Sequence, residues 1–243
     1  MILLIDIGNT NTVCSIYQDS KYIHHIRIEK TENILEDIKM LKKFNIKKIA
    51  ISSVVPKQTK YYCEILNEIY DISPFIISHK NANVKLKVDD ENEVGNDRIC
   101  NIKAAIELTK KNCLVIDFGT ATTYDVINNN QEFIGGAIAP GIDVSANYLI
   151  KKAALLKKTT YKFPSKIIGK NTNTNIQSGV MFGAINSIEG MIMMIQKELE
   201  SELFIILTGG FSKLISSKLS YKHILKPHLT MDGIRLILND HNE

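Results

Sequence analysis

Two short segments of the chain repeat one arrangement, an apolar run that ends in an Asp-x-Gly turn. Residues 2–8 read Ile-Leu-Leu-Ile-Asp-Ile-Gly, and residues 113–119 read Cys-Leu-Val-Ile-Asp-Phe-Gly. Each run has the length and composition of a buried strand. An aspartate at a strand end can bind a cation, directly or through water, and the glycine lets backbone N–H groups approach an anion. Two such turns facing each other would form a cleft for a metal-bound polyphosphate.

The pattern of a β-hairpin follows each turn. Alternating positions at 13–17 precede a polar turn at 18–21 and an apolar stretch at 22–26, and residues 123–134 repeat this order. One Asp-x-Gly turn is a common feature, but two copies in matching context predict a duplication. The organisation resembles the ribonuclease H-like α/β fold of the sugar-kinase, actin and heat-shock ATPase superfamily, with a cleft between its two domains.

Length and composition are those of an ordinary globular protein. The chain is 44% hydrophobic and 23% charged. Its 243 residues are enough for two domains of about 100–150 residues each. The expected ribonuclease H-like domains are residues 1–112 and residues 113–243, with no Gly, Ser or Pro linker between them. No stretch approaches the roughly 20 apolar residues of a membrane span, and the N-terminal run is too short for a signal peptide. These features predict a cytoplasmic protein that does not bind membranes.

The net charge of +4 raises the question of nucleic-acid binding. The basic residues are mostly dispersed lysines, and Arg27, Arg98 and Arg235 are the three arginines of the chain. No arginine-rich run or RNA-binding signature is present. A mildly basic protein that binds a polyanionic nucleotide is the simpler interpretation, without a nucleic-acid partner.

A long helix is predicted for residues 178–199, and two less regular segments precede it. The glycines at 135–141 predict a turn, and residues 157–175 read as a loop. The helix has one regular apolar side, and its glycines at 179, 183 and 190 permit close approach of another helix. Its second apolar side, with Met191, Met193 and Met194, fits either the core or a subunit interface, and the pattern alone favours the core.

Three motifs carry the candidate chemistry. Residues 6–12, Asp-Ile-Gly-Asn-Thr-Asn-Thr, suit a loop that binds phosphates through backbone N–H and hydroxyl groups. Thr208-Gly209-Gly210 follows a predicted strand, and suits either the adenosine side of a nucleotide or a plain strand-to-helix turn.

The third motif, Gly95-Asn96-Asp97-Arg98, lies just before a predicted helix. Asp97 is either a helix N-cap or a base that accepts a proton from a substrate hydroxyl. Arg98 could bind a substrate carboxylate in a bidentate pair. The motif alone leaves both interpretations open.

Taken together and in this order, the motifs resemble those of the type III pantothenate kinase family over nearly the whole chain. The matching segments are residues 6–12, 51–56 (Ile-Ser-Ser-Val-Val-Pro), 93–98, 117–123, 135–141, 168–172, 177–179, 208–210 and 229–233. The resemblance implies ATP-dependent phosphorylation of pantothenate to 4′-phosphopantothenate, the first step of coenzyme A biosynthesis. It also implies a homodimer with its substrate pocket near the interface.

The resemblance assigns roles residue by residue. It implies a magnesium ion near Asp6, a monovalent cation (potassium or ammonium) on Asp117, and proton acceptance by Asp97. The implied ATP contacts are Asp6, Ile7, Gly8, Asn9, Thr10, Asn11, Thr12, Val13 and Thr120. The implied pantothenate contacts are Gly95, Asn96, Asp97, Arg98 and Thr172.

The chain departs from the family pattern at Val88, where the family usually has Tyr or Phe seven residues before the glycine of Gly-x-Asp-Arg. Either the pocket wall is thinner here, or the loop is shifted and another residue fills the space. A non-catalytic regulator is the rival class, but a regulator could lose Asp6, Asp97 or Asp117, and all three are present. Another kinase or phosphatase of the superfamily is a third candidate, against which the Gly-Asn-Asp-Arg turn argues.

Overall fold

The computed structural model describes residues 1–29, 34–153 and 155–241. The chain forms two compact units: Met1–Leu108 together with His228–Glu243, and Thr109–Pro227. The division expected from the sequence, after residue 112, assigned the C-terminal residues to the second domain. They group with the first unit instead, because the last helix packs on a helix of that unit.

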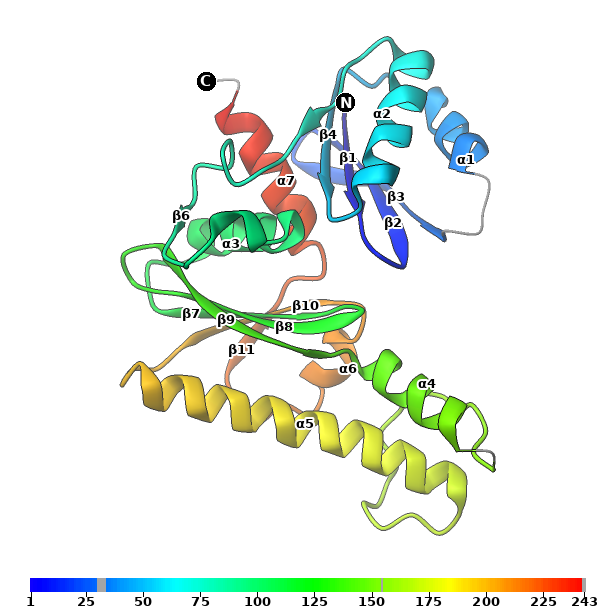
Figure 1. Cartoon of the computed structure of the whole chain (residues 1–243), viewed down its shortest axis with the longest axis vertical. Helices are drawn as coiled ribbons and strands as arrows, with labels where there is room; N and C mark the ends of the chain where they lie inside the picture. Colours follow the sequence, from blue (N-terminus) through cyan, green and yellow to red (C-terminus); the bar gives the residue numbers. More distant parts are fainter. Residues whose placement is uncertain (30–33, 154, 242–243) are drawn as a thin grey trace. The chain divides into compact units, whose positions relative to one another are not determined.

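The first unit contains a five-stranded sheet in the order β3-β2-β1-β4-β5 (Figure 1). Its strands are β1 (Ile2–Ile7), β2 (Asn11–Gln18), β3 (Lys21–Glu29), β4 (Lys48–Ser53) and β5 (Phe75–Ile76). β2 pairs antiparallel with both β1 and β3, whereas β4 pairs parallel with β1 and β5. The first predicted hairpin is confirmed. Its loop contains Asp19 and Ser20, both with positive φ angles, as tight hairpin turns require.

Helices cover both faces of this sheet. One face carries α1 (Ile34–Met40), a 3₁₀ turn (Leu41–Lys43) and α2 (Pro56–Tyr70), and the other carries α3 (Asn96–Leu108) and α7 (Leu229–Asp240) (Figure 1). The short strand β6 (Lys85–Leu86) and a 3₁₀ turn (Glu91–Glu93) precede α3.

Side chains along β1 alternate between these two helical layers. Leu3, Ile5 and Ile7 are buried in the core formed with α1 and α2. Because successive strand residues point to opposite faces, Leu4 and Asp6 point toward the layer of α3 and α7. This alternation brings Asp6 to the helix that begins with the Gly-Asn-Asp-Arg motif.

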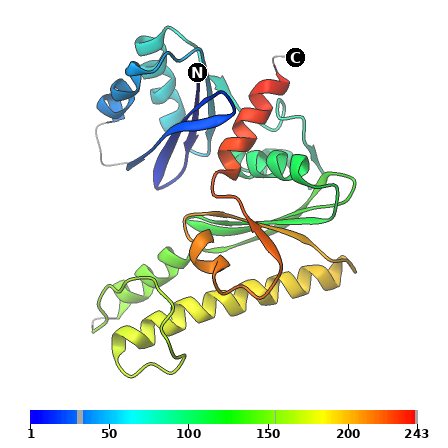
Figure 2. The same ribbon diagram turned by 180° about the vertical axis from the view of Figure 1, so that it is seen from behind.

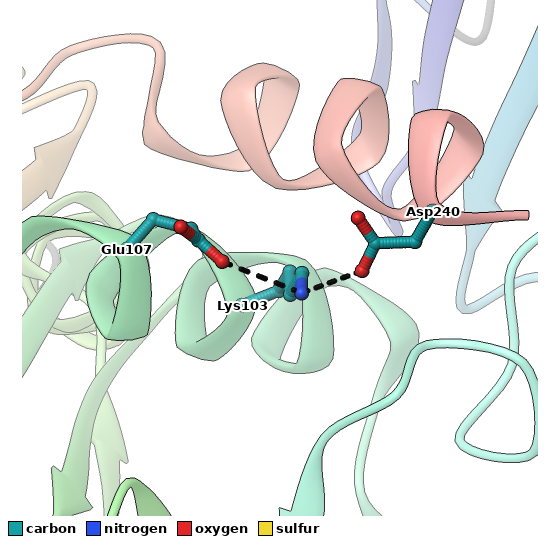
Figure 3. A network of polar contacts seen from close by, with 3 residues as sticks. All are labelled: Lys103, Glu107 and Asp240. Carbon is teal, nitrogen blue, oxygen red and sulfur yellow. Dashed lines mark ion pairs between the residues drawn. The ribbon is translucent and has the colours of Figure 1, made fainter. Parts of the chain in front are cut away.

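Helices α3 and α7 lie against each other in close contact (Figures 1 and 2). A Cβ atom at Gly233 of α7 would lie 1.9 Å from the Cys100 carbonyl oxygen of α3, so this position requires glycine. The buried Lys103 ammonium lies 2.7 Å from Asp240 and 3.5 Å from Glu107 (Figure 3). The ion pairs therefore connect the end of α7 to the helix that carries Asp97.

The second unit repeats the plan of the first. Its strands are β7 (Cys113–Phe118), β8 (Ala121–Ile127), β9 (Glu132–Pro140), β10 (Phe204–Gly209) and β11 (His223–Leu225), in the sheet order β11-β10-β7-β8-β9. β8 pairs antiparallel with β7 and β9, and β10 pairs parallel with β7 and β11. The helices are α4 (Ile142–Lys152), α5 (Thr172–Glu198) and α6 (Ser212–Ser216), and α5 runs along one face of the sheet (Figures 1 and 2).

Most of the glycine-rich segment at residues 135–141 is strand rather than the turn that its composition predicts. It continues β9 as far as Pro140, and Gly141 then caps α4. A Cβ atom at Gly136 would lie 1.8 Å from the Tyr124 carbonyl oxygen of β8, and Gly135 has a φ of +114° where the register of β8 and β9 shifts. Glycine is needed here for close strand approach and a bulge.

Helix α5 begins at Thr172, six residues before the predicted start at 178. A capping box explains the earlier start: the Asn171 side chain accepts a hydrogen bond from the Thr174 N–H, and the Thr174 hydroxyl interacts with the Asn171 backbone. By length and composition alone, α5 is long and apolar enough to cross a membrane. This is weak evidence for a membrane span, because core helices of soluble proteins pass the same test. Its buried residues Met181, Ile185, Ile188 and Ile192 belong to the core of the second unit.

Candidate functional site

The first Asp-x-Gly turn is a tight connection between β1 and β2. The Gly8 N–H donates to the Asn11 carbonyl oxygen at 3.0 Å, and a Cβ atom at Gly8 would lie 3.1 Å from that oxygen. The side chains of Asn9 and Thr10 are exposed at the tip, and Thr12 is buried at the start of β2. The turn therefore presents small polar side chains directly after Asp6, an arrangement that suits anion binding.

The Asp6 side chain accepts a hydrogen bond from a hydroxyl of the neighbouring strand. Asp6 and Ser52 are register partners in the parallel pair of β1 and β4, and the Ser52 hydroxyl donates to Asp6 Oδ1 at 3.0 Å. Burial raises the pKa of the nearby Cys100 thiol well above its ordinary range. The Asp6 carboxylate raises it further, and a hydrogen bond with Ser52 opposes the rise. Asp6, Ser52 and Cys100 therefore form one polar cluster beneath the turn.

Asp97 lies in the first turn of α3, which begins at Asn96, and is not the residue before the helix. Its Oδ1 accepts a hydrogen bond from the Arg98 N–H at 2.8 Å. A Cβ atom at Gly95 would lie 2.6 Å from the same oxygen, so a larger residue there would displace the carboxylate. Burial raises the pKa of Asp97, against the opposing effects of the Arg98 N–H and the Arg98 charge. A carboxylate with a raised pKa is a better proton acceptor at neutral pH.

Strand β4 connects the two parts of the site in the first unit. Ser52 contacts Asp6, and the next carbonyl along, that of Ser53, accepts a hydrogen bond from the Asn96 side-chain amide at 3.0 Å. Both Asp6 and Asp97 also affect the pKa of Cys100. The first unit thus brings together the two segments that the sequence predicted to bind phosphate and to accept a proton.

Asp117 is the next-to-last residue of β7 in the second unit, as Asp6 is of β1 in the first. A Cβ atom at Gly209, whose φ is +86°, would lie 2.3 Å from Asp117 Oδ1, so β10 approaches the carboxylate with bare backbone. The Gly141 N–H donates to the Thr120 carbonyl oxygen at 3.1 Å, and the Thr120 side chain is exposed. The glycines leave backbone groups close to the aspartate and to the turn that follows it.

Thr172, the implied pantothenate contact, lies in the second unit and lines a cavity of about 680 Å³ between α4, α5 and the sheet. Most of the lining is apolar, including Ile142, Leu149 and Val180. Val88 is half-buried between β6 and the 3₁₀ turn before α3. The other implied pantothenate contacts, residues 95–98, belong to the first unit.

The donor set fits a substrate-bound magnesium ion better than a cage built by the protein. In the described part of the chain, no three His, Cys, Asp or Glu side chains are grouped so that they could bind a metal. Mg²⁺ commonly uses one or two carboxylates and completes its shell with water and substrate phosphates. Asp6, beside a polar turn, meets this requirement.

Sequence reasoning assigned no role to Ser52 or to the side chain of Ser53. The available signal was the alternation in β4, where Ile49 and Ile51 are buried against one helical layer and Ser52 therefore points to the other. Locating Asp6 opposite Ser52 required the parallel register of two strands that are more than forty residues apart in the chain.

Comparison with known proteins places these sites in context. The family model described as type III pantothenate kinase matches residues 2–194. The type III pantothenate kinase of Halalkalibacterium halodurans is 38% identical over 98% of both chains, and that of a Sulfurihydrogenibium strain is 40% identical over 96% of this chain and 98% of the relative.

Solved structures show a similar fold at low sequence identity. A Campylobacter jejuni protein named for the Baf family of transcriptional activators has a TM-score of 0.64 at 20% identity, covering 99% of this chain and 98% of its own. The inorganic polyphosphate/ATP-glucomannokinase of an Arthrobacter strain has a TM-score of 0.50 at 12% identity, covering 98% of each chain. The predicted duplicated α/β fold of sugar kinases and actin-like ATPases is confirmed.

Proposed function

The chain belongs to the type III pantothenate kinase family, so its reaction is the phosphorylation of pantothenate in coenzyme A biosynthesis, and we propose how its residues carry out that reaction. ATP is the co-substrate. The observation that carries the assignment of roles is a cluster in the first unit. The Ser52 hydroxyl contacts the Asp6 side chain, and the Ser53 carbonyl oxygen contacts the side-chain amide of Asn96, the residue before Asp97. One strand thereby contacts both the carboxylate proposed to bind magnesium and the residue that precedes the proposed base.

Asp97 accepts the proton of the primary hydroxyl of pantothenate as that oxygen attacks the γ-phosphorus of ATP and the bond to ADP breaks. Phosphoryl transfer depends mainly on positioning and charge neutralisation. The Arg98 guanidinium binds the pantothenate carboxylate and orients the hydroxyl toward Asp97. Its position next to Asp97 in the first turn of α3 supports this division of roles.

ATP phosphates bind to the turn of residues 6–13 and to Thr120. Asp6 contacts the magnesium ion, which when bound offsets the negative charge of the phosphates. Asp117 is the carboxylate ligand of potassium or ammonium. Its place at a strand end, with Gly209 approaching its side chain, supports a site for a weakly hydrated cation.

The active form is a homodimer in which α5 contributes to the interface. Met193 and Met194 are 58% and 61% exposed. Of an apolar stretch of 18 residues within α5, only 28% is buried within one chain. A Cβ atom at Gly179, Gly183 or Gly190 would meet nothing within 4 Å, so a neighbouring helix has room to approach. A partner subunit that covers this surface would also cover the cavity beside Thr172, which Gly179 and Gly183 line. We further propose that the enzyme is cytoplasmic and has no nucleic-acid or membrane partner.

A regulator without catalysis is the rival function, and the similarity in fold to a protein named for transcriptional activation does not favour it, because 20% identity carries the fold alone. The test is a coupled assay for ADP with ATP, magnesium and potassium, and a panel of small hydroxy acids and sugars as acceptors. Pantothenate should be the strongly preferred acceptor. Turnover with a sugar but not with pantothenate, or no ADP from any acceptor, would refute the proposal.

A further inference from the structure

Ser52 belongs to the Ile-Ser-Ser-Val-Val-Pro segment, to which no role in the reaction has been assigned above. Its side chain is fully buried, and its hydroxyl donates to Asp6 Oδ1 at 3.0 Å. The contact follows from the strand register, in which Asp6 and Ser52 are direct partners. The Cys100 thiol of α3 is close enough for the same hydroxyl to lower its pKa, so Ser52 lies between the Asp6 carboxylate and α3.

The hydroxyl is not needed to fill space on this face of the sheet. Ala50, two residues earlier on the same face of β4, is also fully buried, so a small apolar side chain fits beneath α3 and α7. A buried hydroxyl costs free energy unless it is hydrogen-bonded. Serine at position 52 is therefore explained by the carboxylate that it contacts rather than by packing.

The adjacent serine has a different task. The Ser53 hydroxyl accepts hydrogen bonds from the Val55 N–H at 3.1 Å and from the Thr59 hydroxyl at 2.7 Å. These contacts stabilise the entry into α2, on the other side of the strand. Ser52 alone of the pair directs its side chain to Asp6.

The duplicated unit has a hydroxyl residue at the equivalent position. Asp117 at the end of β7 is the register partner of Thr208 in the parallel strand β10, and Thr208 is buried. In both units the aspartate of the Asp-x-Gly turn therefore has Ser or Thr beside it on the parallel neighbour. The repetition links the hydroxyl to the aspartate rather than to a local feature of the first unit.

We propose that Ser52 is a positioning residue for phosphoryl transfer: its hydroxyl holds the Asp6 carboxylate in the orientation that binds the magnesium ion of the ATP complex. The inference rests on the proposed function, because it assigns Asp6 to magnesium. Residues that hydrogen-bond a metal ligand usually contribute 10- to 100-fold to metal affinity or activity.

The test compares ATP binding with and without magnesium in the purified full-length chain, by calorimetric titration with ATP plus Mg²⁺ and with ATP plus a chelator. Ser52→Ala should weaken binding of the magnesium complex about 10- to 100-fold and leave binding of metal-free ATP unchanged. Ser52→Thr, which introduces the residue type found beside Asp117, should retain the magnesium effect.

Ser15→Ala is the matched control. Ser15 is also fully buried in the same sheet, but its hydroxyl contacts His25. This variant should bind both forms of ATP as the wild type does. Equal weakening of both forms by Ser52→Ala, no weakening at all, the same loss in Ser15→Ala, or a loss in Ser52→Thr as large as in Ser52→Ala would each overturn the proposal. A wild type that binds ATP equally with and without magnesium would overturn the assignment of Asp6 itself, and this proposal with it.

Discussion

Replacing Asp97 by asparagine removes the proposed base and leaves its surroundings nearly unchanged. Asparagine has the same shape, and its Oδ1 can still accept the Arg98 N–H bond that Asp97 accepts at 2.8 Å. The close approach of Gly95 to this oxygen is also preserved. The variant should therefore fold and bind ATP as the wild type does, while it cannot take up the hydroxyl proton.

The expected loss of turnover is about 10²- to 10⁴-fold, the usual contribution of general acid–base catalysis. At about 1.36 kcal/mol for each factor of ten, this is roughly 2.7–5.4 kcal/mol of transition-state stabilisation. The pH profile should change as well. Because burial raises the pKa of Asp97, wild-type turnover should fall as the pH drops through that raised value, and the residual activity of the variant should lack this decline.

The stability of Asp97→Asn provides a second readout, because it should stay the same or rise at neutral pH while turnover falls. A carboxyl group with a raised folded-state pKa favours the folded state most at low pH, and this contribution is lost as the pH rises through the folded pKa. Asp97→Asn should therefore unfold at the same or a higher temperature than the wild type at neutral pH, with a smaller difference in acid. Near-normal turnover, or an unchanged acid limb in the pH profile, would refute the role of Asp97 as the base.

Three further predictions concern the ion pairs, the cation and the interface. Asp240→Asn should lower the free energy of unfolding by about 1–3 kcal/mol in thermal denaturation, because the buried Lys103 ammonium loses its 2.7 Å partner. Glu107→Gln removes a half-exposed partner at 3.5 Å and should cost less than about 1 kcal/mol. Equal losses in the two variants would contradict this ranking. Wild-type activity should be low in sodium and restored by potassium or ammonium, and Asp117→Asn should abolish that response; equal rates in sodium and potassium would remove the assignment. Met194→Glu should convert a dimer into a monomer of 27.4 kDa in sedimentation and weaken pantothenate binding, because a charge would be buried without a partner; a wild type that already sediments as a monomer at micromolar concentration would rule out the interface.

Local sequence patterns predicted the strands and turns where a single periodicity determines the structure. The apolar runs before Asp6 and Asp117 end where strands β1 and β7 reach their polar turns, and the two predicted hairpins, β2–β3 and β8–β9, follow. The same reasoning was wrong for residues 135–141, because glycine there serves close strand contact, which only the neighbouring strand reveals. It also placed the start of α5 too late, because the capping box at Asn171 lies in a stretch of polar residues that reads as a loop.

The elements that depend on contacts distant in sequence were beyond such patterns. Helix α7 packs on α3 through Gly233 and the Lys103–Asp240 pair, so its membership of the first unit is set by contacts across more than a hundred residues. The candidate site shows the same limit. Its aspartates were identified by their turns, whereas Ser52 became visible only through the register of two parallel strands.

The central claim is that this chain transfers the γ-phosphoryl group of ATP to pantothenate. The most direct measurement follows ATP labelled in its γ-phosphate, incubated with the purified protein, magnesium, potassium and pantothenate, with the products separated by chromatography and identified by mass spectrometry. The label should appear in 4′-phosphopantothenate, with one ADP for each product molecule, and this transfer should nearly vanish in Asp97→Asn. Label found only in inorganic phosphate, or unchanged ATP in the presence of pantothenate, would contradict the account.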